Sequence, residues 1–128
     1  MDPFVLEATH ATPAVNIDYQ KGTILLTGQS HPEDALKFFK PVIQALDSFE
    51  ELEPIDIVVD FKMLYFNTST ARCIFLILKE LKKLERIGHK VDVNWYAEED
   101  DLDMQETGSD FEVLTGIEIN MILIKVEE

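Results

Sequence analysis

Residues 54–64, PIDIVVDFKML, constrain the fold of this chain more than any other stretch. The run is rich in β-branched residues and is apolar on both faces near its centre, which is typical of a strand in the interior of a sheet. From about Ser69 to Ile87 the apolar residues recur at helical spacing instead, and Gly88 stands where a helix would end. A buried strand that passes directly into an amphipathic helix indicates an α/β arrangement.

Other segments of the chain have the alternating pattern of strands. Gly22 lies between two of these segments and is free to take a positive φ, so it predicts a hairpin turn. We expect these further strands at 4–8, 14–20, 23–30, 90–97 and from 117 to the end of the chain.

Two further helices are expected from the sequence. The first is predicted to begin near Ser30, which stands at capping-box spacing from Glu33, and to kink or split at Pro41. The second lies in the acidic stretch, over 100–106 or 110–115. The order of elements predicts an α/β fold with a mixed β-sheet flanked by about three helices, in a single domain over 1–128.

The formal net charge of −14 restricts the classes of partner. Phosphate backbones and anionic membrane surfaces would be repelled, so neither nucleic acid nor membrane is an expected partner. No transmembrane segment or secretory signal is apparent, and the single cysteine, Cys73, fits a reducing, cytoplasmic setting.

Catalytic and metal-binding groups do not assemble into a recognisable pattern. His10, His31 and His89 are scattered without metal-ligand spacing. Cys73 lies within the apolar pattern of a helix, so a buried small hydrophobe is favoured over a nucleophile. No Gly-rich phosphate loop occurs. We therefore expect no enzyme activity, no metal and no cofactor.

Four polar residues, Asn67, Thr68, Ser69 and Thr70, stand where the strand passes into the helix. One of them is explained as the N-cap, because a side-chain oxygen can accept from a free N–H of the first turn. Four in succession leave a phosphoacceptor or anion site as the alternative. A phosphate here would suit the positive end of the helix dipole, and Arg72, one turn on, could bind it. A docked partner would be expelled, because burying an uncompensated dianion is costly.

The acidic segment around 98–110 does not fit an EF-hand, because Gln105 and Glu106 stand at the fifth and sixth positions of a loop that begins at Asp101. Two interpretations remain open. The segment is either a solvated acidic loop or a docking surface for a basic partner.

The strand, polar turn and helix resemble the phosphorylatable element of STAS-type anti-sigma factor antagonists, although FNTST replaces their usual turn. A closer resemblance is to the SiaC-type regulatory phosphoproteins, a STAS-like partner-switching family. It extends over essentially the whole chain and is carried by TPAVNIDYQKGTILLTGQSHPEDALKFF, DFKMLYFNTSTARCI and WYAEEDDLDMQETGSDFE.

The resemblance implies a phosphorylation circuit. It makes Thr68 the phosphoacceptor, with Ser69 and Thr70 as alternatives. A dedicated Ser/Thr kinase would phosphorylate the protein and a PP2C-like phosphatase would reverse this. The unmodified form would bind and activate a diguanylate cyclase through Asn67, Thr68, Ser69 and Arg72, raising cyclic di-GMP and promoting aggregation and biofilm growth. Two rival hypotheses remain, a small Mg²⁺-dependent phosphohydrolase using Asp100, Asp101 and Asp103, and a constitutive scaffold protein.

Overall fold

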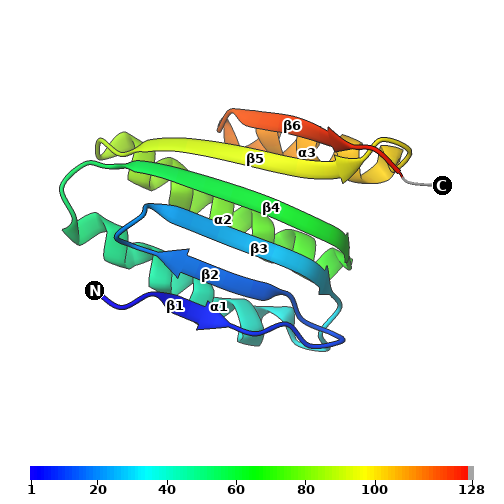
Figure 1. Cartoon of the computed structure of the whole chain (residues 1–128), viewed down its shortest axis with the longest axis horizontal. Helices are drawn as coiled ribbons and strands as arrows, with labels where there is room; N and C mark the ends of the chain where they lie inside the picture. Colours follow the sequence, from blue (N-terminus) through cyan, green and yellow to red (C-terminus); the bar gives the residue numbers. More distant parts are fainter. Residues whose placement is uncertain (127–128) are drawn as a thin grey trace.

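The computed structural model describes residues 1–126 and consists of one mixed β-sheet with helices packed on one face (Figure 1). In chain order the elements are β1 (Phe4–Leu6), β2 (Ala14–Asp18), β3 (Thr23–Ser30), α1 (Ala35–Leu46), the 3-10 helix η1 (Asp47–Glu51), β4 (Asp56–Phe66), α2 (Thr68–Arg86), β5 (Lys90–Glu98), α3 (Leu102–Thr115) and β6 (Ile119–Ile124). The α/β class, the mixed sheet and the three α-helices confirm the fold class predicted from the sequence.

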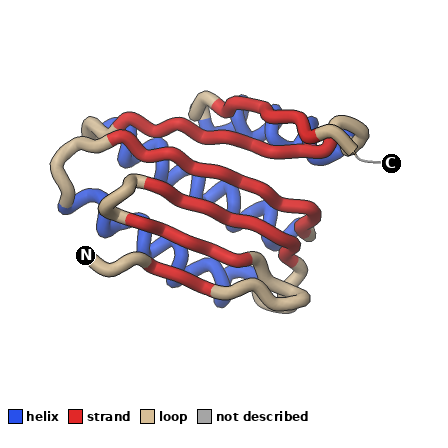
Figure 2. The backbone as a smooth tube through the Cα atoms, viewed as in Figure 1, coloured by secondary structure: helices blue, strands red, loops and turns tan. Residues whose placement is uncertain are grey.

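The six strands lie side by side in the order in which they occur along the chain. β1, β2 and β3 pair antiparallel, and β3, β4, β5 and β6 pair parallel. Each pair of parallel neighbours is joined by one α-helix, and all three helices lie behind the sheet in Figure 2. The carboxyl ends of the four parallel strands therefore meet at one edge of the sheet, at the right of Figure 1.

The hairpin between β2 and β3 confirms the turn predicted at Gly22. Gly22 has a φ of 69°, and a Cβ on this residue would overlap the backbone oxygen of Asp56. The Gly22 carbonyl accepts a hydrogen bond from the amide of Val58 at 2.8 Å. Only glycine combines this backbone conformation with so close an approach.

The core lies between the sheet and the helices. Alternate residues of β4, namely Ile57, Val59 and Phe61, are fully buried, and the apolar stripe of α2 packs in the same layer. Trp95 of β5 is central to the packing of α3, because its ring lies 5.7 Å from that of Phe111. Its Nε1–H donates to a backbone oxygen of α3, that of Met104, at 3.0 Å.

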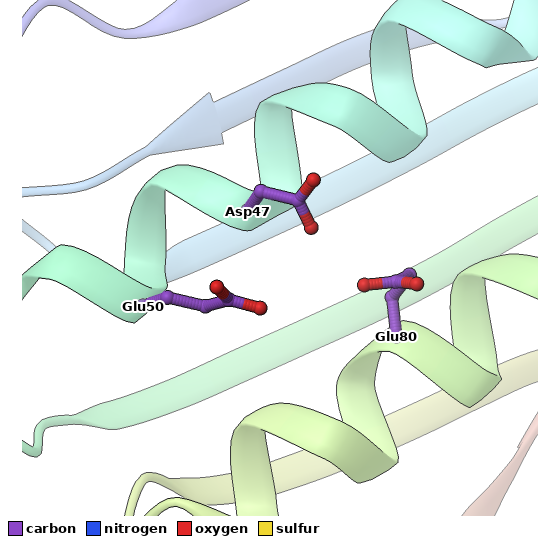
Figure 3. Close-up of side chains that lie close together, drawn as sticks. All are labelled: Asp47, Glu50 and Glu80. Carbon is purple, nitrogen blue, oxygen red and sulfur yellow. The ribbon is translucent and has the colours of Figure 1, made fainter.

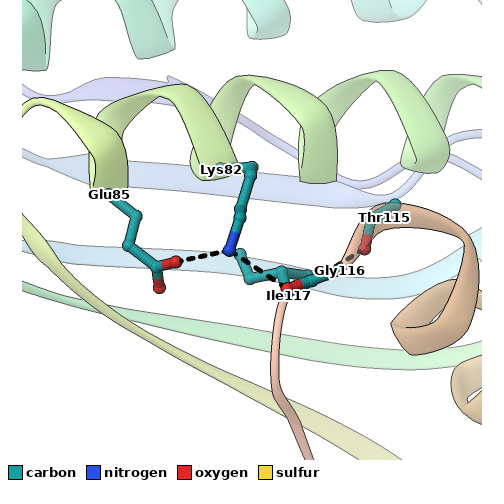
Figure 4. A network of polar contacts seen from close by, with 5 residues as sticks. All are labelled: Lys82, Glu85, Thr115, Gly116 and Ile117. Atoms are coloured by element: carbon teal, nitrogen blue, oxygen red, sulfur yellow. Dashed lines mark hydrogen bonds and ion pairs between the residues drawn. The ribbon is translucent and has the colours of Figure 1, made fainter.

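The far end of α2 is tied to the end of α3 by Lys82 (Figure 4). Its ammonium group donates to Glu85 at 2.9 Å and to the backbone oxygen of Gly116 at 3.1 Å. Gly116, with a φ of 72°, ends α3 in the left-handed conformation. The ammonium group therefore neutralises carbonyl charge near this end of α3.

The predicted start of α1 was wrong, and of the kink or split predicted at Pro41 the split is excluded. The helix is capped by Asp34, whose carboxylate accepts from the amide of Lys37 at 3.1 Å, and not by Ser30, which ends β3 and is buried. Pro41 lies inside α1 without splitting it. The buried side chains of Phe39 and Val42 on either side hold the helix against the core, which offsets the hydrogen bond that the proline cannot make.

The carboxyl-terminal third also differs from expectation. The segment predicted to contain an acidic loop over 98–110 is mostly helix, because α3 runs unbroken from Leu102 to Thr115. It covers all of the predicted alternative 110–115 and all but the first two residues of the alternative 100–106. β6 begins at Ile119, two residues later than predicted, and the expected strand over 127–128 lies outside the described residues. None of the helices described has the length and apolar character required of a membrane span.

Candidate functional site at the carboxyl edge of the sheet

The start of α2 is held in place by Asn67. Its side-chain oxygen accepts from the amide of Thr70 at 2.9 Å, and its own amide donates to the backbone oxygen of Ser30 at 3.0 Å. Asn67 is therefore the N-cap of α2 and is tied to β3 as well. The capping role predicted for the polar cluster, residues 67–70, belongs to this residue.

The three hydroxyls of the cluster lie in different environments. Thr70 is 0% exposed, and its Oγ1 lies 2.8 Å from the Oγ of Ser30. Thr68 and Ser69 are exposed. In the folded protein a kinase could reach Thr68 or Ser69 but not Thr70, so the geometry leaves two of the three candidate acceptors accessible.

The exposed hydroxyls stand at the positive end of a long helix. Thr68 and Ser69 are its first two residues, and the amides of a first turn have no acceptor within their helix. Arg72 is exposed and follows Thr68 by one turn. Among residues 1–126 the salt bridges involve only Lys82 and Lys83, so the guanidinium of Arg72 is free to bind an anion. These features favour a negatively charged group here.

A groove of about 340 Å³ runs between the start of α1 and the start of α2, and we call it the α1–α2 groove. Ser69 and Arg72 line it on the α2 side. Two exposed apolar side chains, Leu36 at 56% and Leu76 at 44%, lie along it. Sequence reasoning found Ser69 and Arg72 but not the two leucines, because the groove depends on how two helices far apart in the sequence pack.

Cys73 confirms the interpretation as a buried small side chain. It lies on the inner side of α2 and is 2% exposed. Burial raises the pKa of its thiol, and the nearby carboxylate of Asp34 raises that pKa further. The thiol therefore stays protonated at neutral pH, which does not suit a nucleophile.

The acidic residues of the rival phosphohydrolase hypothesis do not form a metal-binding group. The carboxylate of Asp101 caps α3 by accepting from the amide of Met104 at 3.1 Å. Within the described residues, one cluster of three side chains that could hold a metal ion has its ligand atoms within 4.8 Å of one another. It lies elsewhere, at Asp47, Glu50 and Glu80 (Figure 3). Glu80 there also pairs with Lys83 at 3.4 Å. Sequence patterns gave no hint of this cluster, since its members come from η1 and α2.

Comparison with models of known protein families identifies the family of the chain. The model of the SiaC family of regulatory phosphoproteins matches residues 6–124. The chain belongs to the SiaC family. A relative, an uncharacterised protein of Pseudomonas aeruginosa strain UCBPP-PA14, is 27% identical over 111 residues, which are 87% of this chain and 88% of the relative.

Solved structures of SiaC share the fold. Apo-SiaC from P. aeruginosa is 26% identical and superimposes with a TM-score of 0.85, over 94% of this chain and 98% of that chain. SiaC in a crystal structure of the diguanylate cyclase SiaD in complex with its activator SiaC, also from P. aeruginosa, gives a TM-score of 0.87 at 24% identity, over 94% and 99% of the two chains. At such identities the likeness shows a common fold.

Proposed function

We propose that this SiaC family member is a single-domain, non-enzymatic partner-switching regulator of the cytoplasm, which binds and activates a diguanylate cyclase while Thr68 is unphosphorylated. A Ser/Thr kinase adds the phosphate and a PP2C-like phosphatase removes it. The active form raises cyclic di-GMP and promotes aggregation and biofilm growth. The observation that carries the proposal is the exposed hydroxyl of Thr68 at the first position of α2, directly before Ser69, which lines the α1–α2 groove.

The partner is inferred from the solved relative. SiaC of P. aeruginosa was crystallised with the diguanylate cyclase SiaD, which it activates. The α1–α2 groove offers a comparable partner the apolar side chains of Leu36 and Leu76 and the polar groups of Ser69 and Arg72. The carboxylates of Glu33 and Asp34 line it as well. An apolar pair beside a free guanidinium has the composition of a protein interface.

The switch follows from the different effects of a phosphate on the free and the bound protein. In the free protein, a dianion at the start of α2 interacts favourably with the helix dipole, by roughly 0.3–1 kcal/mol, and can bind Arg72. Beneath a docked partner the same dianion loses its water, at a cost of several kcal/mol unless the partner supplies compensating groups. Phosphorylation therefore releases the partner and leaves the fold intact.

The direct test compares three variants in binding to the cyclase and in cyclase activity. Thr68→Ala should bind and activate as the unmodified protein does, whereas Thr68→Glu should lose both. Ser69→Ala tests which hydroxyl accepts the phosphate, because it removes the neighbouring exposed hydroxyl, and the binding that it retains should still be switched off by the kinase. Equal binding by Thr68→Glu and Thr68→Ala would rule out the switch. Kinase control that disappears in Ser69→Ala but persists in Thr68→Ala would move the acceptor to Ser69.

A further inference from the structure

A second cavity lies at the same edge of the sheet as Thr68. Its volume is about 480 Å³, and its walls are the ends of β3, β4 and β5, the last residue of β6 and the start of α3. We call it the sheet-edge pocket. In open α/β sheets, ligands bind beyond the carboxyl ends of the parallel strands. The position of this pocket therefore suits recognition.

The walls of the sheet-edge pocket are largely apolar. Leu64, which is 68% exposed, and Ile124, which is 45% exposed, stand at its rim, while Met104 is buried. Gly28 contributes no side chain, at the point where the pairing of β3 with β4 shifts register. A large apolar side chain fits such a cavity better than a charged ligand.

The mouth of the pocket is acidic. Glu98 and Asp101 line it, and Glu99, Asp100 and Asp103 adjoin them. In the part of the chain that the structure describes, none of these carboxylates forms a salt bridge. The lone cation of the lining, Lys62, lies over the ring of Tyr96, 4.8 Å from its centre. An apolar cavity bordered on its β5–α3 side by carboxylates without ion pairs is complementary to an apolar side chain on a basic segment.

One wall of the pocket lies close to the polar cluster in the sequence. Leu64 precedes Thr68 by four residues, and the exposed ring of Tyr65 lies between them in the sequence. A protein large enough to cover Thr68 would also reach the rim of the pocket. We propose that the sheet-edge pocket receives a large apolar side chain from a basic segment of the cyclase, as an anchor separate from the α1–α2 groove. This inference rests on the proposed function.

The test measures the dissociation constant of the full-length cyclase, by calorimetry, for variants of exposed apolar residues. Leu64→Asp should weaken binding at least about tenfold, as loss of an interface hot spot does. Leu64→Ala should also weaken it, which separates lost contact from added charge. The matched control is Val113→Asp, because Val113 is 83% exposed, lies in α3 and does not line the pocket, so binding should change less than about twofold.

The acidic mouth of the sheet-edge pocket can be tested separately. Glu98→Lys reverses an exposed charge at the mouth, so it should slow association with the cyclase and reduce the dependence of the association rate on salt. An association rate that is unchanged or higher would contradict a basic partner segment.

The outcomes distinguish a failure of the pocket proposal from a failure of the proposed phosphorylation switch. Unchanged affinity in Leu64→Asp, with binding still lost in Thr68→Glu, overturns the pocket proposal and leaves the proposed function standing. If Leu64→Asp abolishes self-association in sedimentation while cyclase affinity is unchanged, the occupant is a second copy of this chain and the proposal is wrong. If the unmodified protein does not bind the cyclase, the proposed function fails and the pocket proposal fails with it.

Discussion

At the scale of single residues, three neighbouring hydroxyls have three different surroundings. Thr68 is exposed at the first position of α2, Ser69 lines the α1–α2 groove and Thr70 bonds to Ser30 inside the protein. Asn67 alone supplies the cap. The sequence predicted a cap and left a phosphoacceptor as the alternative, but the inward direction of Thr70 depends on Ser30, 40 residues away, and no local pattern reports that pairing.

The contrast between Thr68 and Thr70 can be measured by substitution with valine, which keeps the shape and removes the hydroxyl. Thr70→Val should lower the free energy of unfolding by about 1–3 kcal/mol, because the buried hydroxyl of Ser30 loses its partner. Thr68→Val should change it by less than about 0.5 kcal/mol, since its hydroxyl faces water. Urea denaturation gives both values. Equal effects of the two substitutions would mean that the Ser30–Thr70 contact makes no net contribution to the free energy of unfolding.

The buried thiol of Cys73 predicts a pH dependence. Its pKa is raised in the folded protein by burial and by Asp34, so the folded state holds this proton more tightly than the unfolded state does. The resulting stability is fully present below the pKa of an unfolded thiol, about 8.5, and is lost as the pH rises through the raised pKa of the folded protein. The difference in unfolding free energy between wild type and Cys73→Ala should therefore shrink in alkaline solution. A difference that stays constant or grows between about pH 7 and pH 10 would contradict the predicted loss of stability at the Cys73 thiol.

At the scale of secondary structure, the elements that sequence patterns predicted best have strong periodicity and clear local signals at their ends. β3 begins and ends at the predicted residues, and the cap at Asn67 marks the start of α2. The start of α1 was misplaced because Ser30 and Glu33 imitate a capping box, although Ser30 belongs to the sheet. The prediction for α3 left two shorter alternatives, because only Met104, Gly108 and Phe111 are buried along it and little apolar pattern marks its full length.

The close packing of α3 on β5 leads to a prediction about Gly108. A Cβ on Gly108 would lie 2.7 Å from Cδ1 of Trp95, so Gly108→Ala must displace the helix or the indole. We expect a loss of about 1–3 kcal/mol in the free energy of unfolding, even though alanine is the better helix former by about 1 kcal/mol. Tryptophan fluorescence follows both the unfolding and the displaced indole. Ser109→Ala, at an exposed neighbouring position, is the control and should be neutral or slightly stabilising.

If Gly108→Ala instead stabilised the protein to the same extent as Ser109→Ala, helix propensity alone would determine the outcome. The contact between Gly108 and Trp95 would then not fix the position of α3.

At the scale of the whole molecule, the connections bring the functional features to one edge. Parallel pairing of β3, β4, β5 and β6 places the polar cluster, the α1–α2 groove and the sheet-edge pocket at the carboxyl ends of these strands. Sequence patterns indicated a partly parallel sheet and a candidate site at its turn. They did not indicate the two cavities, which arise from packing between residues distant in the sequence.

The distribution of charge has a consequence at this scale. The chain carries a net charge of −14, and the basic residues near the end of α2, such as Lys83 and Arg86, lie far along the helix from Thr68. Arg72 is the basic residue in the first turns of α2. A phosphate on Thr68 would therefore meet one guanidinium and the helix start, and not a basic surface of this protein.

The most direct test of this account compares the unmodified protein with protein fully phosphorylated at Thr68, in calorimetric titrations with the cyclase and in thermal unfolding followed by circular dichroism. The account predicts that phosphorylation abolishes cyclase binding, while the helix content is unchanged and the melting temperature is unchanged or slightly raised. Phosphorylated protein that binds the cyclase as tightly as the unmodified form, or that loses binding only because α2 unfolds, would contradict it.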